Sequence, residues 1–191
     1  MDVPETMERL STDRAALSEV LARYDRKRFR ILSLDAASQS FGTILLGWME
    51  KPVAEPLPEV AALLWYWCTA FAEEWNGLQD AADLHPRQLA QIQDLMQADL
   101  ADMDARSVPP GIAQGMVQGR IRAMLEDERA KNPGDVSLRE WGRPGAGVAF
   151  DMGLLDPPFR AAWVWQDEWN SMVVFFETDF AFGYAEWWLA V

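Results

Sequence analysis

The sequence predicts an α+β fold, in which about four N-terminal helices pack on a C-terminal antiparallel sheet of about four to five strands. Apolar residues recur at helical spacing as far as residue 131. After residue 136 the segments become short and rich in Val, Phe and Trp, and Gly, Pro and Asp separate them. The length of 191 residues fits a single domain, 1–191, with a helical part at 1–131 and a strand-rich part at 136–191.

Four segments carry the helical signals. The clearest is 86–105, where Leu89, Ile92 and Met96 begin an apolar stripe with steps of three and four residues. The segment 59–76 is apolar on most faces, so we expect a central, buried helix there. The segment 31–48 mixes small residues with a short apolar run and is ambiguous. The predicted helices are 12–29, 59–76, 86–105 and 112–131.

Five short segments in the last third of the chain are typical of strands, because they combine β-branched and aromatic residues between turn residues. Residues 166–170 have the length of a hairpin connection between two of them. The predicted strands are 136–141, 148–151, 161–165, 171–177 and 186–191.

Acidic residues dominate the charge, with 30 Asp and Glu against 17 Lys and Arg, for a formal net charge of −13. Residues 151–191 contain one basic and seven acidic side chains, and they also hold five of the ten tryptophans. Acid and large aromatic side chains therefore coincide in the predicted sheet. A net negative charge favours basic protein partners and opposes binding to nucleic acid, whose phosphates would repel it.

The single cysteine and single histidine exclude a disulfide framework and any zinc site made from several such ligands. The N-terminus lacks a basic region followed by an apolar stretch, and the longest uncharged runs are shorter than the roughly 20 residues that span a bilayer. We therefore expect a soluble, cytoplasmic protein without a membrane interaction.

No short catalytic motif is present, and we predict no catalytic residue, metal ligand or cofactor. His85 precedes a predicted helix, and Cys68 lies in an apolar run, which lowers the reactivity of a thiol. The aspartates at 99, 102 and 104 lack the glycine that an EF-hand loop requires, and we interpret them as a charged, solvated helix face.

Two further sequence patterns each have more than one interpretation. Gly111, Gly115 and Gly119 share one helix face and indicate either close approach of another helix or a loop. Five basic residues within 23–30 could contact nucleic acid or an acidic partner, but we favour a helix C-terminus, whose dipole favours positive charge.

Our leading hypothesis is an acidic module that binds and neutralises a basic partner enzyme, such as a toxin or a nuclease-like enzyme, by occluding it. Tryptophan suits this role because it buries a large area with little loss of rotamer freedom. In general character, being small, acidic and poor in motifs, the chain resembles bacterial immunity proteins, which implies a toxin-neutralising immunity protein or antitoxin. The predicted partner-binding residues are Trp163, Trp165, Asp167, Glu168, Trp169, Glu177, Asp179 and Glu186.

Two alternatives belong to other classes. A carboxylate-dependent hydrolase would use two separated acids, one with a raised pKa, in an aromatic-lined cleft. A structural or adaptor subunit would instead assemble with itself or with a larger complex.

Overall fold

The computed structural model describes residues 2–23, 29–35, 43–51, 58, 60–61, 64–65, 86–102, 106–131, 137–140, 148–149 and 152–189. Within this part of the chain, four α-helices and an antiparallel sheet form an α+β fold, which confirms the predicted class. His85 and Cys68, together with most of the predicted helix 59–76, lie outside the described residues.

Two short helices begin the chain, and a side-chain cap starts each of them. The Asp2 carboxylate accepts from the Glu5 amide at 3.0 Å, and the Glu5 carboxylate accepts from the Asp2 amide at 3.2 Å, which makes a capping box. Asp13 caps the second helix by accepting from the Ala16 amide at 3.0 Å. The two helices are α1, Val3–Thr12, and α2, Arg14–Ala22, so the predicted helix 12–29 is shorter than expected.

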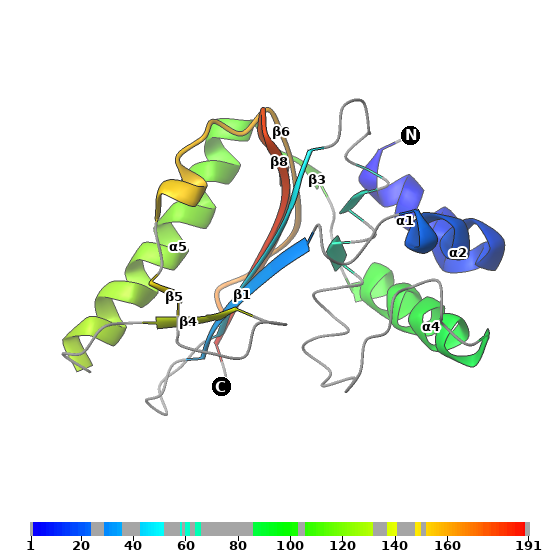
Figure 1. Ribbon diagram of the computed structural model, residues 1–191, viewed down its shortest axis with the longest axis horizontal. Helices are drawn as coiled ribbons and strands as arrows, with labels where there is room; N and C mark the ends of the chain where they lie inside the picture. The colour runs from blue at the N-terminus through cyan, green and yellow to red at the C-terminus, as the bar shows by residue number, and fades with distance from the viewer. Residues whose placement is uncertain are drawn as a thin grey trace.

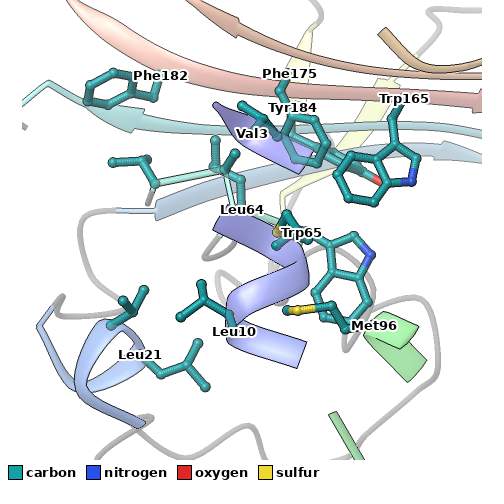
Figure 2. Close-up of a cluster of buried hydrophobic side chains, with 14 of the residues drawn as sticks. Val3, Leu10, Leu21, Leu64, Trp65, Met96, Trp165, Phe175, Phe182 and Tyr184 are labelled. Carbon is teal, nitrogen blue, oxygen red and sulfur yellow. The ribbon is translucent and has the colours of Figure 1, made fainter. Parts of the chain in front are cut away.

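The third described helix packs beside this pair, and the amphipathic stripe predicted for it is confirmed. Leu89, Ile92 and Met96 are buried, and Gln93 donates to the Leu10 carbonyl of α1 at 3.2 Å. This helix is α4, Pro86–Asp102. The buried residues Val60, Ala61, Leu64 and Trp65 join the same cluster (Figure 2).

The sheet has eight strands in the order β3-β6-β7-β8-β2-β1-β4-β5, and every described pairing is antiparallel. Five of them follow the last helix, as predicted, and three join from the N-terminal part. The strands are β1 (Phe29–Asp35), β2 (Thr43–Glu50), β3 (Arg106–Ser107), β4 (Ser137–Glu140), β5 (Val148–Ala149), β6 (Ala161–Asp167), β7 (Ser171–Glu177) and β8 (Ala181–Trp188).

Helices cover both faces of this sheet (Figure 1). The helices α1, α2 and α4 lie on one face, and the long helix α5, Pro110–Lys131, lies on the other with the 3₁₀ helix η3, Met152–Leu155. Alternate strand residues divide between two cores, so that Phe175 faces α1 while Val174 and Phe176 face α5. We call these the α1-side core and the α5-side core.

In the part of the chain that the structure describes, no other helix packs closely against the glycines of α5. Gly111, Gly115 and Gly119 are exposed, and a Cβ built at any of them would meet nothing within 4 Å. Both interpretations are therefore corrected: these glycines lie within α5 and not in a loop, and on its outer face, while Ala113 and Val117 face the sheet.

No helix in the described part of the chain combines the length and apolar character that a bilayer crossing requires.

Candidate functional site

The eight predicted partner-binding residues lie on β6, β7, β8 and their two connecting turns, but the structure does not gather them into one patch. They separate between the two ends of the strands and between surface and core. The seven residues of β7 alone span about 20 Å from one end to the other. Asp167, Glu168 and Trp169 lie at one end, and Glu177 and Asp179 lie at the other.

The β6–β7 turn is held by its own backbone. The Glu168 amide donates to the Ser171 carbonyl at 2.8 Å, and the Leu189 amide donates to the Asn170 carbonyl at 2.8 Å. The second bond ties the turn to the end of β8. The turn therefore has a defined place next to Trp188, which pairs with Ser171 in the sheet register.

Two tryptophans lie open to solvent at this end of the sheet. Trp169 is 70 % exposed and Trp188 is 42 % exposed. Single exposed apolar residues are common, but two indoles on adjoining segments form a potential interaction surface. We call Asp167, Glu168, Trp169 and Trp188 the hairpin tip.

Two arginines offset the acidic charge of the hairpin tip. Arg106 of β3 pairs with Asp167 at 3.1 Å between Nη2 and Oδ2. Arg120 of α5 lies with Cζ 4.4 Å from the Trp187 ring centroid and donates to the Glu168 carbonyl at 3.4 Å. The Glu168 side chain makes no ion pair with any described residue. Its carboxylate is thus the tip's unpaired charge.

Two more of the predicted acids, Glu177 and Asp179, are engaged in ion pairs at the opposite end. Asp179 accepts two bonds from Arg160, at 2.7 and 2.6 Å, and the hydrogen bond from this guanidinium lowers the pKa of Asp179. Glu177 accepts from Lys51. Phe180, 73 % exposed, lies in the same turn. These acids belong to a separate surface from the hairpin tip.

Trp163 and Trp165 belong to the α1-side core. Trp165 is fully buried, with an edge-on contact to Phe175 at 5.5 Å between ring centroids, and Trp163 is partly buried against the same cluster (Figure 2 labels Trp165). The register shifts between Val164 and Gln166, where a bulge interrupts β6. The two indoles lie on the same face of the sheet, and helices cover that face.

Glu186 lies on the α1 side of β8 and is partly buried. The Tyr184 hydroxyl donates to Glu186 Oε2 at 2.6 Å. Burial raises the pKa of Glu186, and the nearby charge of Asp99 on α4 raises it further, while the Tyr184 bond opposes the shift. Asp99 itself accepts from the Trp65 indole at 2.7 Å.

Sequence reasoning did not include Trp188 among the site residues. The Trp-rich segment was recognised, but only the register of β7 against β8 brings Trp188 beside the β6–β7 turn. Among the described residues, no group of three His, Cys, Asp or Glu side chains is placed to hold a metal ion.

Comparison of the chain with protein-family models, with curated proteins and with solved structures found no match.

Proposed function

We propose that the chain is a protein-binding module that neutralises a basic partner enzyme, with the hairpin tip as its contact surface. The most concrete form is a toxin-neutralising immunity protein or antitoxin. The observation that carries the proposal is the exposure of Trp169 and Trp188 on adjoining, hydrogen-bonded segments. Exposed tryptophans that become buried on binding are frequent energetic centres of protein interfaces.

The electrostatic support comes from the whole molecule more than from the tip. Arg106 and Arg120 offset the local carboxylates, whereas the net charge of −13 attracts a cationic protein over a longer range. Steering of this kind raises the association rate and weakens with added salt. At close range, Glu168 would meet a basic group of the partner while the indoles fill an apolar depression.

The first test is co-purification and binding kinetics with the product of the adjacent gene, at low and high salt. Trp169→Ala is expected to weaken binding by about 30-fold or more, the size of an interface hot spot. Phe180→Ala is the matched control, because Phe180 is equally exposed but lies at the other end of the sheet. Its affinity should change less than about twofold.

Three results would contradict the proposal: absence of binding to that product, an association rate independent of salt, or equal affinities for wild type, Trp169→Ala and Trp188→Ala. Thermal unfolding of each variant separates a lost contact from lost folding, since both tryptophans are substantially exposed.

A second candidate, a carboxylate-dependent hydrolase, is favoured by one observation. Glu186, with its raised pKa, lies near Asp99, and the Trp165 indole N–H close to this region is buried without a hydrogen-bond partner among the described residues. A raised carboxyl pKa beside a second acid suits general acid catalysis. Hydrolysis of chromogenic glycosides that Glu186→Gln abolishes would favour it. The adaptor alternative is tested by light scattering for self-association.

A further inference from the structure

A cavity of about 220 Å³ lies at the end of the sheet opposite the hairpin tip. It is partly open to solvent and lies where β2 ends and β8 begins, beside η3. Its walls are mainly apolar and belong to the α5-side core and its surroundings. They include Leu46, Trp48, Leu155, Pro157, Phe176 and Phe180.

The aromatic wall of this cavity is held in place by packing. The Phe176 ring stacks on Phe159 at 4.1 Å between centroids, with 5° between the ring planes. The same ring lies directly over Gly183, where a Cβ would be 2.0 Å from it. A strand glycine thus leaves the space in which the ring lies flat on the sheet.

Of the polar side chains that line the cavity, one already has its hydrogen bonds satisfied within the protein and another does not. The Thr178 hydroxyl accepts from the amides of Phe180, at 3.2 Å, and Ala181, at 2.9 Å, and donates to the Ala181 carbonyl at 3.2 Å. It has no further proton to donate. Glu50, at the end of β2, is exposed, and its side chain has no hydrogen bond or ion pair in the part of the chain that the structure describes.

The neighbouring lysine does not neutralise Glu50. Lys51 pairs with Glu177 and lies over the Phe182 ring at 5.4 Å, and Phe182 belongs to the α1-side core. Lys51 is therefore directed to the opposite face of the sheet. Glu50 is thus the one carboxylate among the described residues that line this mainly apolar cavity, and the Trp48 wall also carries the Arg30 guanidinium of β1, with Cζ 4.7 Å from the ring centroid.

We propose that this cavity binds a compact organic cation, with an aromatic or branched aliphatic body and one primary ammonium group. A cavity of about 150 Å³ accommodates benzene, so the larger volume here leaves room for a ring with a short chain. The ring would lie beside Trp48 and against the edge of Phe176, whose two faces already pack on Phe159 and Gly183, and the ammonium group would reach Glu50. This site is independent of the hairpin tip, which lies at the other end of the strands.

The test uses three probes with the same ring: 2-phenylethylamine, 2-phenylethanol and 3-phenylpropionate. Binding is followed by amide chemical shifts, with Gly47 and Ala181 as the reporters that line the cavity. The amine should bind about two- to fivefold more tightly than the alcohol, the range of an exposed ion pair, and the carboxylate should bind most weakly.

The variant Glu50→Gln should remove the preference for the amine while retaining binding of the alcohol. The matched control is Glu8→Gln, an exposed glutamate of α1 on the other side of the sheet, which should keep the preference. Phe180→Ala should weaken the binding of all three probes by a similar factor, because this residue contributes apolar surface to the cavity wall and no charge.

Equal affinity of wild type for amine and alcohol would overturn the proposal, and so would a preference that survives in Glu50→Gln. Absence of shifts at Gly47 and Ala181 at millimolar probe concentrations would also overturn it. Protein binding lost in Trp169→Ala with amine binding unchanged would show that the two sites are separate.

Discussion

The ionisation state of the Glu186 side chain is expected to affect the stability of the fold. Its pKa is raised by burial and by Asp99, so the folded state holds the proton more tightly than the unfolded state. The unfolding free energy is then expected to fall as pH rises from the ordinary value of 4.5 through the folded pKa of this group.

The variant Glu186→Gln is expected to remove this pH dependence. It keeps an oxygen that accepts from Tyr184, and it avoids the ionised carboxylate in a partly buried position. Relative to wild type, its stability should increase with pH across that window. Urea unfolding at several pH values measures the difference, and parallel pH profiles for the two proteins would contradict the prediction.

Gly183 is a position where a methyl group cannot be accommodated without movement. A Cβ there would lie 2.0–2.5 Å from three atoms of the Phe176 ring, which is itself stacked on Phe159. Gly183→Ala should reduce the unfolding free energy by about 1–3 kcal/mol, the usual cost of overpacking. Chemical denaturation measures it, and a change near zero would show that the ring moves freely.

At the scale of the element, α5 contains glycines that its packing does not require. Gly115 and Gly119 lie on the exposed face of a 22-residue helix, with open space where a side chain would be. Replacing each by Ala should increase the unfolding free energy by about 0.5–1 kcal/mol, because Ala loses less backbone entropy in a helix. Gly183→Ala is the same chemical change, but its expected effect on the unfolding free energy has the opposite sign.

The sequence was most informative for elements with one buried face. The helix predicted at 112–131 corresponds to α5, and the stripe begun by Leu89 and Ile92 predicted α4. β2 is harder to predict from the sequence because both of its faces are covered. Leu45 and Leu46 are both buried, so the residues along the strand do not alternate in polarity. A short apolar run of this kind does not distinguish strand from helix.

The candidate site depended on information that local patterns do not contain. Trp165 and Trp169 are four residues apart and equally apolar, yet one is fully buried and the other is 70 % exposed. The difference follows from which face of β6 the helices cover and from where the turn projects. Pairing register and layer order are long-range properties, and a grouping based on sequence proximity therefore joined residues that the fold separates.

At the scale of the whole molecule, a sheet between two helical layers leaves its strand ends as open surfaces. One end carries the two exposed tryptophans, and the other carries Phe180 beside the cavity. The two proposed sites are therefore far enough apart that the free-energy changes caused by substitutions at each should add independently. Binding of a protein at the first is expected to leave amine affinity at the second unchanged.

Each edge of the described sheet is formed by a strand of only two residues, β3 at one side and β5 at the other. A peptide that joins a sheet as an extra strand needs a row of unpaired backbone amides and carbonyls along such an edge. Edge strands this short are one of the devices by which proteins limit edge-to-edge association between copies. Recognition by this molecule is accordingly expected to act through side chains at the strand ends, with specificity set by their shape and charge.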